Sequence, residues 1–189
     1  MTALLSLERG ATSGTVASHV ASDNVQGGQM ADDLILQKLG KSGSVVELEG
    51  VPGTSAARDR GMGFNQAVDS ASGVKVVARQ AADFDRTKGL NVMENIRQAQ
   101  SDVQAVFAHN DEMALGAIKA IQASGRDILV VGFDGTGDAV KAVQDGSMLA
   151  TVAQQAGMIG SLGIETADKI IKGQSVADYT PVPLQLITQ

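Results

Sequence analysis

The 189-residue sequence contains no cysteine and no tryptophan, and it has only four phenylalanines and one tyrosine. Without cysteine the chain has no disulfides, thiolate metal sites or cysteine nucleophiles, and its redox compartment is left open. With aromatic residues at 3% of the chain, the core must be built from aliphatic residues and methionine. The formal net charge is -6 and Lys and Arg form no cluster, which argues against a nucleic-acid partner.

Long apolar runs are also missing, and none is long enough to span a bilayer. The opening residues 1–9 lack the basic start and the full apolar segment of a secretory signal, so we expect no signal peptide within this chain. Whether a signal was removed from a longer precursor stays open. Hydrophobic residues make up 43% of the sequence and charged residues 19%, which is typical of a chain with a packed core.

Short β-rich runs alternate with amphipathic stretches along the chain. This alternation is typical of βαβ units and predicts the α/β class, with a doubly wound, mainly parallel sheet covered on both faces. The predicted strands are 15–22, 44–49, 74–80, 105–108, 128–133, 149–153 and 182–187. The predicted helices are 26–39, 55–69, 87–99, 112–124, 139–144 and 158–172. We expect C-terminal glycine caps at Gly40, Gly125 and Gly173, and N-caps at Thr54 and Asp111.

Polar side chains follow most of the predicted strands. Ligands of open α/β sheets bind beyond the carboxyl ends of the strands, so these side chains are candidates for a binding site. Carboxylate, amide and guanidinium groups can bridge neighbouring hydroxyls, and a phenylalanine ring can lie against the apolar face of a sugar. The set therefore favours a neutral sugar site. Its members are Asp23, Asn24, Arg58, Arg60, Asp83, Phe84, Asp85, Arg86, His109, Asn110, Asp111, Glu112, Asp134 and Gln154.

Motifs for catalysis or cofactor binding are not supported. Neither Gly40-Lys41-Ser42 nor Gly61-x-Gly63 has the further glycines and the preceding strand that a phosphate-binding loop requires. His19 and His109 lack metal-ligand spacing and are expected to be ordinary strand or strand-end residues. No Gly-x-Ser-x-Gly elbow occurs, and no pair of carboxylates is indicated for glycoside hydrolysis. We predict no catalytic residues, no metal and no cofactor, and hence no enzyme.

Longer stretches of the sequence resemble the bacterial D-ribose-binding protein family, and the similarity covers nearly the whole chain. The resemblance implies a periplasmic solute-binding protein that supplies D-ribose or a related monosaccharide to the membrane permease of an ABC transporter. In some bacteria the family also serves a chemoreceptor. The matching stretches are 18–24 (SHVASDN), 53–61 (GTSAARDRG), 82–93 (ADFDRTKGLNVM), 106–116 (VFAHNDEMALG) and 131–136 (VGFDGT).

The resemblance also implies a set of sugar-binding residues. Phe84 stands at the position of the stacking phenylalanine, and Glu8 stands where the family has an aspartate. The extra methylene of Glu8 moves its carboxylate by about one C–C bond, ~1.5 Å, so the family's contact need not carry over to it. Arg58 has no counterpart among the sugar contacts and is expected to form a surface or inter-lobe ion pair. The remaining positions that match sugar contacts are Arg9, Arg60, Asn110, Asp134 and Gln154.

The family has two lobes that close on the sugar, and the resemblance divides this chain unequally between them. Residues 23–154 are expected to form a complete sugar-binding lobe of the periplasmic-binding-protein type I. Residues 1–22 would hold a remnant strand of the N-terminal lobe, around 3–7, and the hinge, and residues 155–189 a hinge return, a helix and a final strand. At ~30 residues per unit, about three units of the N-terminal lobe would be missing, which predicts weakened ribose binding.

Three other interpretations stay open at this point. The first is the effector-binding region of a LacI-type regulator, although the chain is acidic and shows no helix-turn-helix. The second is an α/β enzyme that modifies sugars, although no set of residues supports it. The third is an interaction module that forms a homodimer through the apolar face of the predicted helix 158–172.

Overall fold

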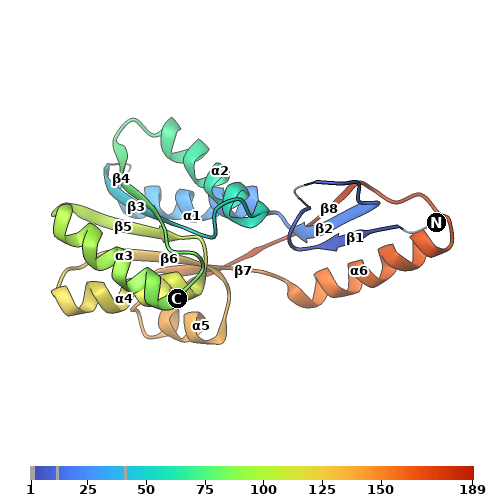
Figure 1. Cartoon of the computed structure of the whole chain (residues 1–189). Coiled ribbons are helices and arrows are strands. Elements are labelled where there is room, and N and C mark those ends of the chain that lie inside the picture. Colours follow the sequence, from blue (N-terminus) through green and yellow to red (C-terminus); the bar gives the residue numbers. More distant parts are fainter. Residues whose placement is uncertain (1–2, 12, 41) are drawn as a thin grey trace.

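The computed structural model describes residues 3–11, 13–40 and 42–189, which form two sheets of unequal size (Figure 1). The larger sheet has six strands in the order β4-β3-β5-β6-β7-β9. All its neighbouring strands are parallel except β7 and β9, so the prediction of a mainly parallel α/β sheet is confirmed. Its strands are β3 (Gly43–Glu49), β4 (Val74–Ala81), β5 (Val103–Ala108), β6 (Leu129–Asp134), β7 (Ala150–Ala153) and β9 (Gln185–Ile187).

Helices cover both faces of the larger sheet, as a doubly wound fold requires. On one face, Ile35 and Phe64 belong to an aliphatic and aromatic cluster that includes the inner residues of β3, β5 and β6. On the other face, Met93, Met113 and Val143 belong to a separate cluster with side chains from the same strands. The first pair of helices is α1 (Asn24–Lys38) and α2 (Ser55–Ser70), and the second group is α3 (Arg86–Ala99), α4 (Asp111–Ser124) and α5 (Gly137–Gln144).

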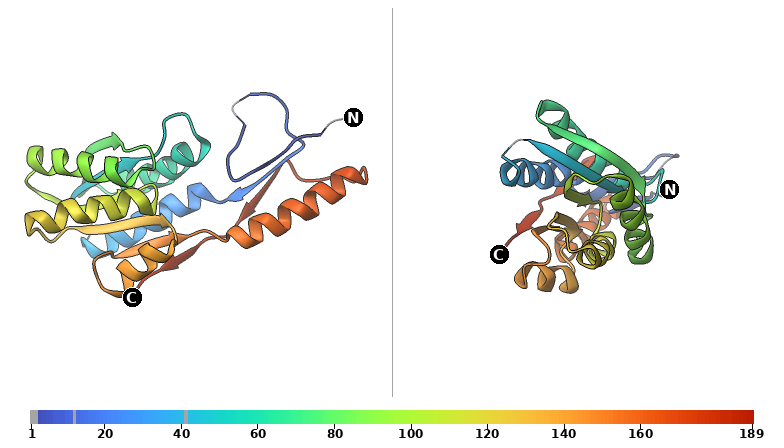
Figure 2. Two further views of the ribbon diagram at one scale, coloured as in Figure 1. Left: turned by 60° about the horizontal axis from the view of Figure 1, so that its bottom comes forward. Right: turned by 90° about the vertical axis from the view of Figure 1, so that its left-hand side faces the viewer.

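The smaller sheet has three parallel strands in the order β1-β2-β8, with α6 (Ala156–Ile171) packed against it. Its core is small and includes Val20, Ile159 and Val182. Figure 2 shows this unit extending away from the larger body, so the molecule is elongated. No helix within the described part of the chain is both long and apolar enough to cross a membrane. The strands are β1 (Leu5–Leu7), β2 (Ser18–Ser22) and β8 (Tyr179–Val182).

Helices α1 and α2 lie unusually close together because glycines occupy their interface. A Cβ at Gly28 would overlap the carbonyl oxygen of Arg60, and a Cβ at Gly63 would overlap that of Val25. The absence of side chains at these two positions lets the backbones approach, which is a common reason for glycine within a helix. Arg60, in the second turn of α2, reaches the carbonyl of His109 after β5 and the carboxylate of Asp134 at the end of β6.

Several local predictions need correction. The predicted strand 182–187 is wrong, because the chain leaves the smaller sheet after Val182 and enters the larger one at Gln185. Pro183 lies at this break and has no N–H for a sheet ladder. The predicted strand 15–22 begins only at Ser18. Thr54 is confirmed as an N-cap, and positive φ angles follow the helix ends at all three predicted glycines, Gly40, Gly125 and Gly173.

The N-cap prediction for Asp111 is wrong. Asn110 caps α4, and its Oδ1 accepts a hydrogen bond from the backbone N–H of Met113 at 3.0 Å. Asp111 is instead fully buried, and its carboxylate accepts from Thr151 Oγ1 at 2.7 Å and from the N–H of Thr136 at 2.8 Å. It therefore ties the start of α4 to β7 and to the start of α5, which a pattern of local sequence does not reveal.

Candidate functional site

One cavity of about 240 Å³ lies at the carboxyl ends of the strands of the larger sheet. Its lining brings together all seven residues that the resemblance singled out, although they come from six separate segments of the chain. Among the described residues, the cavity is lined further only by Ala56, in the first turn of α2, which the sequence did not indicate. The seven residues are Glu8, Arg9, Arg60, Phe84, Asn110, Asp134 and Gln154.

Arg60 is the central charged group of the cavity, and it is only 3% exposed. Its Nε donates to Asn24 Oδ1 at 2.8 Å, and one terminal nitrogen donates to the carbonyl of His109 at 2.6 Å and to Asp134 Oδ1 at 3.3 Å. The guanidinium lies over the Phe133 ring, 3.6 Å from its centroid. Burial lowers the pKa of Arg60, while the nearby carboxylates oppose this effect. Arg60 is therefore a rigidly held donor.

Asp134 is the main acceptor of the cavity. Its Oδ1 also accepts from Gln154 Nε2 at 2.7 Å. Burial raises the pKa of Asp134 to about 6, even though the positive charge of Arg60 acts in the opposite direction. Asp134 is therefore mostly ionised at neutral pH, but burial deprives its carboxylate of hydrogen bonds from water. Ligand hydroxyls can supply these hydrogen bonds instead.

Strained backbone is concentrated around the cavity. Among the described residues, the non-glycine residues with positive φ are Glu8 (60°), Asp83 (54°), Phe84 (60°) and Asp134 (124°). Each such residue costs on the order of 1–3 kcal/mol and persists only where the surrounding structure imposes it. Three of the four line the cavity, which is the distribution expected of a binding site rather than of ordinary loops.

Phe84 lines the cavity with its aromatic ring. The tip of the ring lies against Gly50, where an added Cβ would overlap it. The guanidinium carbons of Arg9 and Arg60 lie 5.8 and 5.9 Å from the ring centroid. Asn110 Nδ2 donates to the carbonyl of Phe84 at 3.3 Å, which ties the strained turn to the start of α4. The cavity thus combines a fixed apolar plate with hydrogen-bonding edges.

His109 lies beneath the cavity rather than in it. Its ring is 1% exposed, with Nε2 at 2.9 Å from Glu47 Oε1 and Nδ1 at 3.3 Å from the N–H of Gly50. Burial would raise the pKa of Glu47, but hydrogen bonds from His109 and Arg79 and the positive charge of Arg79 outweigh it and lower the pKa. This network supports Gly50, against which the Phe84 ring lies.

The other strand-end candidates lie outside the cavity. Arg58 forms an exposed ion pair with its neighbour Asp59, with Nε and Oδ1 2.7 Å apart. Arg86 pairs with Glu112 and Asp138 on the surface. Asn24, one of these strand-end candidates, and Ser22, which the sequence did not single out, are buried and bond to cavity residues from behind. The position of Asn24 after a strand indicated it, whereas Ser22 carries no such signal.

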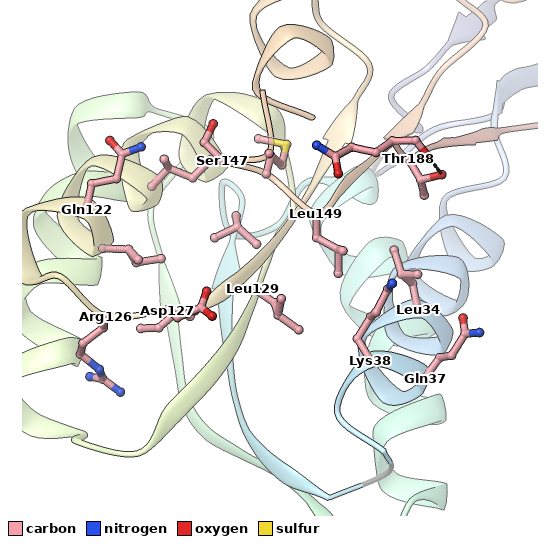
Figure 3. A pocket seen from close by; sticks show the side chains of 17 residues that line it. Leu34, Gln37, Lys38, Gln122, Arg126, Asp127, Leu129, Ser147, Leu149 and Thr188 are labelled. Atoms are coloured by element: carbon pink, nitrogen blue, oxygen red, sulfur yellow. Dashed lines mark hydrogen bonds between the residues drawn. The ribbon is translucent and has the colours of Figure 1, made fainter. Parts of the chain in front are cut away.

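A larger hollow of about 580 Å³ lies at the opposite end of the sheet, near the amino ends of β6 and β7 (Figure 3). Aliphatic side chains such as Leu129 and Leu149 line it together with polar ones, and Figure 3 shows Lys38 and Arg126 on opposite sides of it. The Arg126 guanidinium is already bonded to the carbonyls of Gln100 and Val103. None of the seven residues that the resemblance singled out lines this hollow, so the smaller cavity is the candidate site.

Comparison with known proteins shows the family of the chain. The periplasmic binding protein domain model matches residues 3–175. Two ribose import binding proteins are similar, with 58% identity over 186 residues for that of Haemophilus influenzae and 56% over 187 for that of Escherichia coli K12. Each alignment covers 98% of this chain and 63% of the relative, so the chain spans less than two thirds of their length.

A solved structure shows the same fold. The periplasmic binding component of the arabinose ABC transporter of Shewanella sp. ANA-3, bound to L-arabinofuranose, is similar with a TM-score of 0.90 and 32% sequence identity. The similarity covers 97% of this chain and 65% of that one. The fold described above is therefore shared with a solved periplasmic binding protein.

Proposed function

This chain belongs to the periplasmic binding protein family, and from that premise we propose that it is the solute-binding component of an ABC importer for ribose or a closely related monosaccharide. The observation that carries the proposal is the convergence of the seven residues on one cavity. The relatives named above are ribose import binding proteins, which supports ribose as the first sugar to test. The family's location supports a periplasmic site of action, with the importer's permease as the membrane partner and a chemoreceptor as a further one.

The charges of the cavity support a neutral ligand. Arg9 and Arg60 contribute two positive charges, and Glu8 and Asp134 contribute two negative charges when ionised. A charged ligand would unbalance this set, whereas a sugar satisfies both signs, since each hydroxyl can donate to a carboxylate and accept from an arginine. The Phe84 ring would then cover the apolar face of the sugar.

We propose that this chain by itself holds ribose weakly. The cavity is an open one, and its described residues cover one side of a ligand rather than enclosing it. Sites that bind tightly bury most of the ligand surface. Compared with a site that encloses the ligand, each hydrogen bond or ring contact that is lacking removes about 1 kcal/mol from the free energy of binding. A one-sided site therefore corresponds to a dissociation constant on the order of millimolar.

Titration of the 15N-labelled chain with ribose, followed by NMR, tests both statements. We expect saturable shifts at Asn110 and Gln154 side-chain amides, with millimolar affinity, and loss of these shifts in Phe84→Ala. Asp138→Ala is the control, because Asp138 carries an exposed carboxylate that does not line the cavity. No saturable shift at the cavity would refute the sugar site, and micromolar binding by the monomer in calorimetry would refute the weak affinity.

We also propose that the chain self-associates through the outer face of α6. Ile164 is 75% exposed and Ile171 is 84% exposed, and Met158 lies on the same helix with 42% exposure. Apolar groups this exposed favour association with a second apolar surface. Light scattering should show a dimer that Ile164→Glu dissociates, and a monomer at high concentration would contradict this.

A further inference from the structure

Ser22 lies behind the cavity, at the end of β2, and is 1% exposed. It does not line the cavity. Its hydroxyl donates to Gln154 Oε1 at 2.7 Å, and its backbone N–H donates to Glu8 Oε2 at 3.2 Å. Its carbonyl accepts from Asn24 Nδ2 at 3.1 Å. Three polar groups of one residue therefore contact three different parts of the site.

The bonds through the hydroxyl have a defined direction. Asp134 has a carboxylate, which when ionised can only accept, so the Gln154 amide must turn its nitrogen toward it. The Gln154 carbonyl then faces Ser22, whose hydroxyl supplies the proton. Glu8 Oε2 lies 3.2 Å from the same hydroxyl, but the hydroxyl has one proton and the bond to Gln154 is the shorter. The other oxygen, Glu8 Oε1, is buried, has no hydrogen-bond partner among the described residues, and lies 3.7 Å from a terminal nitrogen of Arg60.

The bond through the carbonyl reaches Arg60. Asn24 donates its amide nitrogen to Ser22, so its amide oxygen is turned toward Arg60 Nε at 2.8 Å. Asn24 is itself 5% exposed, and this bond fixes one edge of the guanidinium plane. The remaining nitrogens of Arg60 therefore point toward Asp134 and Glu8.

We propose that Ser22 is the positioning residue of the site and sets the hydrogen-bonding polarity and orientation of Gln154, Glu8 and Arg60 for the sugar. This proposal rests on the proposed function, because it takes the ligand to be a sugar. Ser22 belongs to the smaller sheet, whereas Gln154 and Arg60 belong to the larger body. Its hydroxyl therefore also links the placement of the two units to the geometry of the cavity.

The test compares Ser22→Ala with a matched control, Ser18→Ala, in the full chain. Ser18 lies on the same strand, is 0% exposed, and donates its hydroxyl to the carbonyl of Ala177 at 2.7 Å, away from the cavity. Both variants lose one buried hydrogen bond, so their losses of stability should be similar. Only Ser22→Ala should shift the Gln154 side-chain amide resonances and speed their hydrogen exchange, with no sugar present.

Ribose titration supplies the second measurement. We expect Ser22→Ala to weaken binding roughly 10-fold, the usual effect of leaving a buried acceptor unpaired, and Ser18→Ala to change it less than twofold. In a Gln154→Ala background, Ser22→Ala should have a much smaller effect, because the residue through which it acts is gone. Ser22→Thr keeps a hydroxyl at this position, so the Gln154 side-chain amide resonances should return to their wild-type positions.

The outcomes separate the two proposals. Unchanged Gln154 resonances in Ser22→Ala, or equal effects of Ser22→Ala and Ser18→Ala on ribose affinity, would overturn the role of Ser22. If the wild-type chain binds no ribose while the Gln154 resonances still respond to Ser22→Ala, the proposed function fails and the positioning role stands.

Discussion

Replacing Asp32 by alanine should stabilise the protein by an amount that grows with pH. Asp32 lies within α1 and is 0% exposed, and neither of its carboxylate oxygens has a hydrogen-bond partner among the described residues. Burial raises its pKa from 3.8 to about 7, and the charge of Asp33 adds to the effect. A buried carboxylate without partners is a source of instability once it ionises.

The sign and size of the effect follow from proton linkage. The folded protein keeps the Asp32 proton up to about pH 7, whereas the unfolded chain releases it near pH 3.8. Between these values the unfolded state binds fewer protons, so this carboxylate lowers the free energy of unfolding as the pH rises. The loss is about 1.7 kcal/mol at pH 5 and, as an upper limit, about 4 kcal/mol at pH 8. Alanine removes the carboxylate and favours the helix.

Guanidinium chloride unfolding followed by circular dichroism at pH 5 and pH 8 measures the difference. The gain from Asp32→Ala over wild type should be larger at pH 8 by roughly 2 kcal/mol. Gln29→Ala is the control, because Gln29 is uncharged and exposed on the same helix and should change stability by only a few tenths of a kcal/mol at either pH. An equal gain at both pH values, or a loss of stability at pH 8, would refute the reasoning.

Three further predictions concern the site and its support. Ribose affinity should fall about tenfold between pH 7.5 and pH 5, because protonation of Asp134, with its pKa of about 6, removes an acceptor; NMR titration at both pH values checks this. Gly50→Ala should weaken ribose binding roughly tenfold in the same assay, because its Cβ displaces the Phe84 ring. Gly63→Ala should lower the free energy of unfolding by about 3 kcal/mol in denaturant, because its Cβ overlaps the carbonyl of Val25 and separates α1 from α2.

Each prediction has its control and its contradiction. Asp134→Asn should abolish the change in affinity with pH, and an affinity that is constant in the wild type would contradict the role of this carboxylate. Gly137→Ala and Gly160→Ala are controls for the glycine substitutions, since an added Cβ at either meets nothing within 4 Å. If these controls had effects equal to those of Gly50→Ala and Gly63→Ala, the effects would come from replacing any glycine and not from the close approach of neighbouring atoms at Gly50 and Gly63.

The sequence predicted elements better than it predicted their ends and their partners. Alternating β-rich and amphipathic segments indicated the doubly wound sheet, because these patterns record which face of each element is buried. The prediction of one strand over 182–187 was wrong because Val182 pairs within the smaller sheet, whereas residues 185–187 pair within the larger one. Asp111 was misplaced as a cap because its partners Thr136 and Thr151 lie far along the chain.

What the sequence by itself determined is the α/β class and a set of candidate binding residues: strand-end position indicated Arg60, Phe84, Asn110, Asp134 and Gln154, and the family resemblance added Glu8 and Arg9. Both are local properties, since periodicity and motif are read over a few consecutive residues. Only the tertiary structure brought those seven residues together, showed Asp32 to be buried without a partner, and placed Ser22 and Asn24 behind Gln154 and Arg60. The physical reason is that burial and hydrogen-bond partners depend on segments distant in the chain, which no local pattern contains.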